Sequence, residues 1–374
     1  MMIQKYITSY RGMALSVALV AVLYLQLASC GGGVARPADP IKVGVIGPFT
    51  GVAAFYGQYM REGIDLALED FNKAGGIGGR NITLVYEDDK CIDLKSVPVI
   101  MEKFKSVDEV VGTIGPFCSS PIIIAAEFAQ ENGIVMVTPG DNLGKKSASA
   151  FSTRYLLSDE ADAIAGYAIS HGKKRIAILY LDSDWGRSYK EAIRNFLGKN
   201  SGELISAEPY AYDNLDVRTQ LAKIKMAKPD ALVVIDGTGG DLFKQVKEIG
   251  FDIPVFSEWQ IEKDPSAVAP DYLEGVVYFR PQDSSTPAFR ESFTSKYGHA
   301  PNVIMVDSYD AAMVLFDGLK ACSGKGSDCI AARISDLKDW PGAEGPLTFD
   351  RDRWAFGKLL IPKTVKDGRF VQIG

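Results

Sequence analysis

The chain has 374 residues but only two histidines, His171 and His299, and neither stands at ligand spacing from a cysteine. The sequence therefore predicts no metal site. It also lacks a Gly-x-Ser-x-Gly nucleophile elbow, a Gly-x-x-x-x-Gly-Lys phosphate loop and a partner motif beside either histidine. These absences argue against an enzyme, and we expect neither catalysis nor a bound cofactor.

Basic residues are also fewer than acidic residues. The chain has 41 lysines and arginines against 47 aspartates and glutamates, which gives a formal net charge of −6. A nucleic-acid partner needs a basic face for its phosphates, so we expect no nucleic acid to bind. After residue 29 the chain also lacks an apolar run of the ~20 residues that a membrane-spanning helix needs.

The one long apolar run, 13–27, follows the basic residues Lys5 and Arg11, and this order is typical of an export signal. The run is about 15 residues long, which is too short to span a membrane core. The segment Leu27-Ala28-Ser29-Cys30 resembles the lipobox of bacterial lipoproteins. This resemblance implies cleavage after residue 29 and lipidation of Cys30. The alternative is an ordinary secretory signal with a chance cysteine at its end.

Removal of the signal peptide, residues 1–29, leaves 345 residues with 39 basic and 47 acidic side chains, a net charge of −8. This length exceeds what one hydrophobic core usually covers, so we expect two domains. Residues 30–40 begin with three glycines after Cys30 and are predicted to be a flexible tether. We therefore expect the mature protein in the periplasm or on the outer face of the cell membrane, anchored by lipid at Cys30 alone.

Four further cysteines fit an exported protein: Cys91, Cys118, Cys322 and Cys329. In an oxidising compartment they suggest two disulfides, for which three pairings exist. Cys322 and Cys329 flank a short segment rich in glycine and serine and can close a small loop, which leaves Cys91 with Cys118. Buried free thiols are the alternative.

Short apolar strands alternate with amphipathic helices along the rest of the chain. Strands are predicted at 41–46, 82–86, 110–114, 134–137, 175–181, 231–235, 254–256 and 276–279. Helices are predicted at 56–73, 97–104, 122–132, 161–169 and 189–197. This alternation is typical of parallel sheets of the βαβ type, and its restart midway indicates two Rossmann-like α/β lobes with helices flanking each sheet.

Ligands bind outside the carboxyl ends of the strands in open parallel sheets. Three loops at such ends, 47–57, 115–121 and 138–142, combine glycine or proline with small polar side chains. Ser119 and Ser120 start a predicted helix, where hydroxyls and free backbone N–H groups can bind an anion such as a carboxylate. Helix capping alone is the alternative interpretation of both serines.

An ordered series of segments carries a family resemblance. The segments are Gly47-Pro48-Phe49-Thr50-Gly51, Tyr56-Gly57, 72–79, 87–91, Cys118-Ser119-Ser120, 133–134, Thr138-Pro139-Gly140, 182–186 and 345–350. The series resembles the branched-chain amino acid binding proteins, which are the extracytoplasmic receptors of hydrophobic amino acid ABC transporters. No single motif is decisive, but the order holds from about residue 41 to the end.

The resemblance implies a periplasmic binding protein type 1 fold, in which two lobes joined by three crossovers close on a ligand. It places residues 41–157 and 283–352 in the N-terminal lobe, and residues 158–282 and 353–374 in the C-terminal lobe. It also implies that Cys91 and Cys118, which match the family's disulfide positions, are bonded to each other.

The resemblance also implies roles for single residues. Ser119 matches a serine that contacts the ligand's α-carboxylate, and Tyr56 falls where an aromatic side chain lies against the ligand. Asn142 is a departure, because these receptors usually have a threonine there that contacts the ligand head group. Trp185 matches an aromatic position of the second lobe, and packing at a helix start is its alternative interpretation.

The second lobe departs further from the family. Amino acid receptors carry a tyrosine after the strand 231–235 and an acidic residue after the next strand, which pairs with the ligand's ammonium. Here Asp236 and Glu258 are the acidic candidates, with a helix cap and a solvated loop charge as their respective alternatives. The predicted ligand-binding set is Tyr56, Ser119, Ser120, Gly140, Asn142, Trp185, Asp236 and Glu258.

Taken together, the sequence predicts a lipid-anchored receptor that captures a small ligand between two lobes and delivers it to an ABC permease. A branched-chain or other hydrophobic amino acid is the leading ligand class, with an aromatic carboxylate, an amide or urea as alternatives. A ligand sensor built on the same two lobes and a purely structural surface lipoprotein are the rival functions. We expect a monomer, because the fold forms its cleft without a partner chain.

Overall fold

The computed structural model describes residues 39–141, 143, 147–238, 240–262, 269–283, 285–323, 326–355 and 357–373. The predicted signal peptide, most of the tether, Cys30 and Asn142 lie outside these residues. Within the described part of the chain, no helix is long and apolar enough to cross a membrane.

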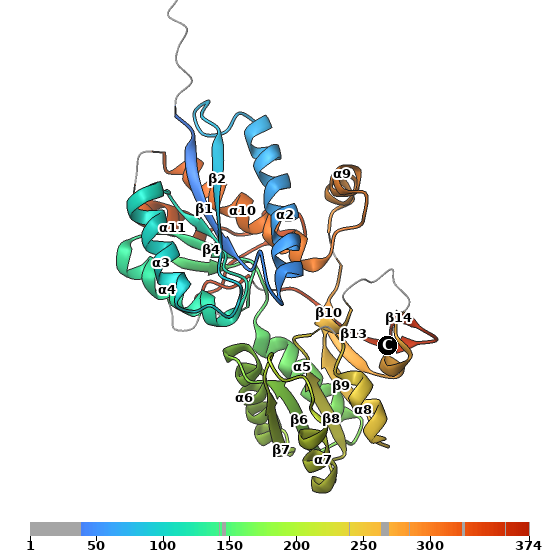
Figure 1. Cartoon of the computed structure of the whole chain (residues 1–374). Coiled ribbons are helices and arrows are strands. Elements are labelled where there is room, and N and C mark those ends of the chain that lie inside the picture. Colours follow the sequence, from blue (N-terminus) through green and yellow to red (C-terminus); the bar gives the residue numbers. More distant parts are fainter. Residues whose placement is uncertain are drawn as a thin grey trace, which may run out of the picture. The chain divides into compact units, whose positions relative to one another are not determined.

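Five parallel strands form the first sheet, in the order β2-β1-β3-β4-β5 (Figure 1). The strands are β1 (Ile41–Gly47), β2 (Ile82–Asp88), β3 (Thr113–Ile114), β4 (Met136–Thr138) and β5 (Ala150–Ser152). The connecting helices are α2 (Ala54–Lys73), α3 (Ser96–Lys103), the π-helix η1 (Phe104–Asp108) and α4 (Ser119–Asn132). Because β1 lies between β2 and β3, the loops after β1 and β3 diverge to opposite faces, which leaves a crevice at the carboxyl ends.

Seven strands form the second sheet, in the order β14-β13-β10-β9-β8-β6-β7. Strands β6 to β10 are parallel and repeat the order of the first sheet, whereas β13 and β14 are antiparallel additions at one edge. The strands are β6 (Arg175–Leu181), β7 (Glu203–Tyr210), β8 (Ala231–Ile235), β9 (Val255–Glu258), β10 (Val277–Pro281), β13 (Leu360–Lys366) and β14 (Arg369–Gln372). The helices among them are α5 (Leu157–Ser170), α6 (Asp184–Lys199), α7 (Arg218–Ala227), α8 (Phe243–Ile249), η2 (Trp259–Ile261) and η3 (Asp271–Leu273).

The segment between β10 and β13 returns to the first sheet. It contains α9 (Pro287–Tyr297), α10 (Val303–Ala321), α11 (Ser327–Ser335) and the short hairpin of β11 (Trp340–Gly342) and β12 (Gly345–Leu347). Helix α10 packs against α2, β3 and β4. The chain therefore passes between the two sheets three times, after β5, after β10 and before β13. The two mainly parallel sheets with flanking helices and this threefold connection confirm the predicted fold class.

The packing of α10 on α2 depends on a glycine. A Cβ atom at Gly63 of α2 would lie 2.2 Å from the carbonyl oxygen of Met305 in α10. Any larger residue at this position would push the two helices apart, because backbone atoms cannot yield as a flexible side chain can. The absence of a side chain at Gly63 thus sets the position of α10 against α2. It also sets the position of the residues that α10 presents to the crossover segments.

Both predicted disulfides are present, so the alternative of free thiols is wrong. Cys91 bonds Cys118, and Cys322 bonds Cys329. The first disulfide joins the loop after β2 to the residue before α4. The second closes a small loop between α10 and α11, far along the chain from the first.

Two predicted strands, 175–181 and 231–235, coincide with β6 and β8, and the other predicted elements differ at their ends by a few residues. Strands β5, β7 and β11 to β14 and helices α7 to α11 were not predicted. Most residues of β7 are half-buried or exposed and give no continuous apolar run. The helix predicted at 189–197 begins earlier, at Asp184, because the Ser183 side chain accepts a hydrogen bond from the backbone N–H of Gly186 and caps it.

Candidate functional site

A cavity of about 280 Å³ lies at the carboxyl ends of the two sheets. Its wall on the first-sheet side comes from α2, the loop after β2, the start of α4 and the loop after β4. Its wall on the second-sheet side comes from the loops after β6, β7 and β9. Both walls are therefore made where open parallel sheets bind ligands.

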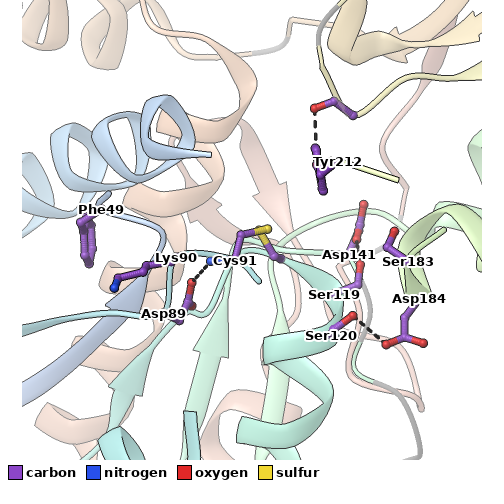
Figure 2. Close-up of a disulfide and its surroundings, with 12 residues drawn as sticks. Phe49, Asp89, Lys90, Cys91, Ser119, Ser120, Asp141, Ser183, Asp184 and Tyr212 are labelled. Atoms are coloured by element: carbon purple, nitrogen blue, oxygen red, sulfur yellow. Dashed lines mark hydrogen bonds between the residues drawn. A yellow bond between two sulfur atoms is a disulfide. The ribbon is translucent and has the colours of Figure 1, made fainter. Parts of the chain in front are cut away.

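The first-sheet wall is held by two cross-links between loops. The carboxylate of Asp88 at the end of β2 accepts hydrogen bonds from the backbone N–H of Phe49, at 2.8 Å, and of Thr50, at 3.3 Å. The disulfide between Cys91 and Cys118 then joins the loop after β2 to α4 (Figure 2). Because both cysteines line the cavity, the disulfide itself forms part of its surface.

Aromatic side chains line the cavity from both sides. Tyr56 stacks on Phe117, with ring centroids 4.9 Å apart, and Trp185 packs edge-on against Tyr189 at 5.2 Å. The buried hydroxyl of Tyr56 has no hydrogen-bond partner. Burial, followed by the neighbouring Tyr212 hydroxyl, raises the pKa of Tyr56 well above its usual value. These rings can cover the apolar body of a small solute, and the free hydroxyl can contact its polar end.

Two hydrogen bonds join Asp141, in the loop after β4, to opposite sides of the cavity. One carboxylate oxygen accepts from the Ser119 hydroxyl at 3.0 Å, and the other accepts from the indole N–H of Trp185 at 3.1 Å. Burial raises the pKa of Asp141, although the Arg154 guanidinium opposes the shift. A further bond, 2.7 Å from the Ser120 hydroxyl to Asp184, also joins the two sides (Figure 2).

On the second-sheet side, Tyr212 comes from the loop after β7 and reaches the loop after β8. Its hydroxyl donates to the carbonyl of Gly237 at 3.4 Å, and a Cβ atom at Gly237 would lie only 2.7 Å from that hydroxyl. The family resemblance implies a tyrosine after β8, but this chain has none at 236–240. In the structure Tyr212 lines the cavity instead, with Gly237 making room for its ring.

Asp236 and Glu258 are fully buried and lie behind the cavity wall. Asp236 accepts hydrogen bonds from the backbone N–H of Thr238 and of Gly240, so it organises its own turn. Glu258 accepts from the backbone N–H of Gln260, while its other oxygen has no partner. The alternative of a solvated loop charge is therefore wrong for Glu258. Burial, with a further contribution from Glu160, raises its pKa well above the usual value.

The structure thus brings Tyr56, Ser119, Ser120 and Trp185 to one cavity. Gly140 is buried beneath it, where an added Cβ would lie 2.3 Å from the carbonyl oxygen of Phe117. Sequence reasoning missed eleven further lining residues, namely Ile92, Leu94, Phe117, Asp141, Leu181, Asp182, Ser183, Asp184, Arg187, Tyr212 and Gln260. For Asp141 a signal existed, because it stands in the loop 138–142 that was singled out, one position before Asn142.

A buried ion-pair cluster connects the crossover segments. Asp307 of α10 accepts hydrogen bonds from Arg154, at 3.0 Å, and from Lys358, which precedes β13. Arg154 also lies over the ring of Trp259, 4.6 Å from its centroid, and one of its nitrogens has no partner. The anionic neighbours outweigh burial and raise the pKa of both Arg154 and Lys358. Both bases are therefore charged, and Asp307 is the carboxylate that they share.

Among the described residues, no group of histidine, cysteine, aspartate and glutamate side chains is arranged to hold a metal ion. The polar side chains at the cavity carry hydroxyls, an indole N–H, carboxylates, the Gln260 amide and the Arg187 guanidinium. This set can bind a small organic solute by hydrogen bonding and charge.

Comparisons with known proteins agree with this geometry. Residues 40–359 match a family model described as periplasmic binding protein. The chain is 27% identical to an amino acid binding protein of Pseudomonas aeruginosa, over 86% of this chain and 88% of that protein. It is 25% identical to the Leu/Ile/Val-binding protein of Escherichia coli K12, over 91% of this chain and 92% of that protein.

Solved structures share the fold. A leucine binding protein from Thermotoga maritima matches with a TM-score of 0.78 at 22% identity, covering 89% of this chain and 98% of its own. A solute binding protein of an ABC transporter from R. palustris, in complex with benzoate, also matches with a TM-score of 0.78. Its identity is 21%, over 90% of this chain and 96% of its own. Proteins of this fold thus include one named for leucine and one solved with benzoate.

Proposed function

The chain belongs to the periplasmic binding protein family, and from this premise we propose that it is the solute receptor of an ABC importer. It captures a small molecule in the cavity between the two sheets and presents it to a permease in the membrane. The observation that carries the proposal is the cavity itself, which is lined from both sheets by aromatic rings and contains the unpartnered hydroxyl of Tyr56. Catalysis and a purely structural role have no comparable support.

The ligand class follows from the lining and from the relatives. A hydrophobic amino acid side chain fits beside Tyr56, Phe117 and Trp185, and the names of the relatives favour amino acids, branched-chain ones in particular. An aromatic carboxylate, an amide or urea is the alternative class, and a sensor with the same cavity is the alternative role. The predicted lobe boundaries, at residues 157, 282 and 352, remain part of this proposal.

Binding of a ligand should change the fluorescence of Trp185, because the indole ring lines the cavity wall. Binding at about 100 times the Kd stabilises a native protein by about 2.7 kcal/mol, so the melting temperature should rise with ligand concentration. A thermal-shift screen with L-leucine, L-leucinamide, isovalerate and benzoate, paired with tryptophan fluorescence, tests this. Trp185→Phe is the matched control, since it should lose the fluorescence change but keep a thermal shift. Failure of amino acids, amides and carboxylates alike to raise the melting temperature would contradict the proposal.

We also propose that lipid on Cys30 holds the mature protein outside the cytoplasm. Replacement of Cys30 tests this location. Cys30→Ser should move the protein from the membrane fraction to the soluble extracytoplasmic fraction, because the variant lacks the thiol that would carry the lipid. Cell fractionation followed by immunoblotting measures this. Continued recovery of the variant with the membranes would rule out the lipid anchor.

A further inference from the structure

The Ser119 hydroxyl at the start of α4 already donates to a carboxylate that belongs to the chain. Backbone N–H groups at the first turn of a helix attract anions, and the hydroxyl of Ser119 adds a donor there. In this structure the donor is used by Asp141, whose oxygen lies 3.0 Å from the Ser119 hydroxyl. A carboxylate arriving on a ligand would have to share the same hydroxyl with a like charge.

The other oxygen of Asp141 is also engaged, by the Trp185 indole N–H at 3.1 Å. Both ends of this carboxylate are therefore fixed in the cavity wall by side chains from opposite sides. A side chain held in this way is not free to turn away from an incoming anion. Asp141 thus acts as a fixed negative group on the inner surface of the cavity.

The bases near Asp141 are paired with other carboxylates. Among the described lining residues the one base is Arg187, and it is paired with Asp182 and Asp184. Behind the wall, the guanidinium of Arg154 is paired with Asp307, although it lies close enough to Asp141 to oppose the rise in the pKa of that carboxyl. Two further buried acids, Asp236 and Glu258, lie close enough to Tyr56 to raise the pKa of its hydroxyl.

A buried polar atom at the cavity adds a second, independent observation. The hydroxyl of Tyr56, which lines the cavity, has no hydrogen-bond partner, although Tyr56 is only 5% exposed. A buried hydroxyl needs a partner, and it can accept a hydrogen bond from a ligand as well as donate one. Together with the carboxylate of Asp141, it offers acceptors to a ligand at the inner surface.

We propose that the cognate ligand is an apolar amine without a carboxylate, whose ammonium group faces Asp141 and Ser119. Examples of this class are the amides of branched-chain amino acids and the simple amines that carry the same branched aliphatic groups. The inference rests on the proposed function, since it specifies the solute of the same cavity. Asp141 engages the Ser119 hydroxyl that the carboxylate of an amino acid would otherwise need.

Isothermal titration of the purified protein with L-leucinamide, L-leucine and isovalerate tests this proposal. The three compounds share the branched aliphatic body and differ in ammonium and carboxylate groups. We expect L-leucinamide to bind at least about tenfold more tightly than L-leucine, and isovalerate to bind least, because like charges at a desolvated site are strongly unfavourable.

The variant Asp141→Asn should reverse this order. It keeps the size of the side chain and removes the charge, so L-leucinamide should lose at least about tenfold in affinity while L-leucine gains. The gain is a readout that misfolding cannot imitate. The matched control is Asp252→Asn, the same substitution at an exposed position before the amino end of β9, and it should keep the wild-type order.

The outcomes separate the two proposals. If wild-type protein binds L-leucine or isovalerate more tightly than L-leucinamide, the amine assignment is overturned and the receptor function stands. If Asp141→Asn leaves the order of the three compounds unchanged, the assignment to Asp141 is likewise overturned. If no amino acid, amide or carboxylate binds at all, the receptor function fails, and the ligand assignment fails with it.

Discussion

Replacement of Asp307 by asparagine is expected to lower the free energy of unfolding by about 3–5 kcal/mol, which is the usual cost of leaving a buried charge without its partner. Asp307 is fully buried, and its two oxygens accept from Arg154 and Lys358. Lys358 keeps Glu344 as a second partner, whereas Arg154 already has one unpartnered nitrogen. Arg154 is therefore the base that the substitution leaves without a charged partner.

Urea denaturation followed by circular dichroism measures this change. Glu191→Gln is the matched control, because it removes one partner of an exposed ion pair with Arg194, half of whose side-chain surface is open to solvent. Such pairs contribute at most about 1 kcal/mol. A loss below about 1 kcal/mol for Asp307→Asn, equal to that of the control, would show that the cluster does not hold the crossover segments together.

Loss of the disulfide between Cys91 and Cys118 is expected to cost about 3.5 kcal/mol, because the bond closes a loop of intermediate length in the unfolded chain. The two cysteines are 27 residues apart in sequence. The double variant Cys91→Ser, Cys118→Ser should therefore melt well below the wild type. Since both sulfur atoms lie at the cavity, it should also bind L-leucinamide or any other confirmed ligand more weakly.

The second disulfide provides the comparison. Cys322 and Cys329 are 7 residues apart, so Cys322→Ser, Cys329→Ser should cost about 2 kcal/mol. These residues do not line the cavity. Chemical denaturation and ligand titration of both double variants separate the two effects. Equal losses of affinity in the two variants would mean that the disulfide at the cavity acts only through global stability.

The fold was largely predictable because its signals are local. Strand β6 is almost entirely buried and apolar, and its bounds coincide with those predicted. Strand β7 was not predicted, because only its last residue is buried and its edge position needs no continuous apolar run. Such a polar stretch forms a strand only because it pairs with β6 in the folded protein, and this depends on tertiary structure.

The candidate site was predictable only for side chains whose place follows from their position at the end of a strand or the start of a helix. Ser119 follows directly from its position at the start of α4. Tyr212 lines the cavity because its ring crosses to Gly237 of another loop, and sequence spacing carries no signal for that contact. Asp141 was passed over for its neighbour Asn142, since the choice between adjacent loop residues depends on the backbone turn that follows β4.

The bonds that the chain makes across its own cavity bear on the kinetics of solute entry. The hydrogen bonds from Ser120 to Asp184 and from Trp185 to Asp141 join the two sides directly. If a solute can enter only while these bonds are broken, the rate of uptake into the cavity would level off at the opening rate at high concentration. Because the bonds need no solute, they would favour the closed shape in either case, and a permease that recognises this shape would have to discriminate between the closed forms with and without solute.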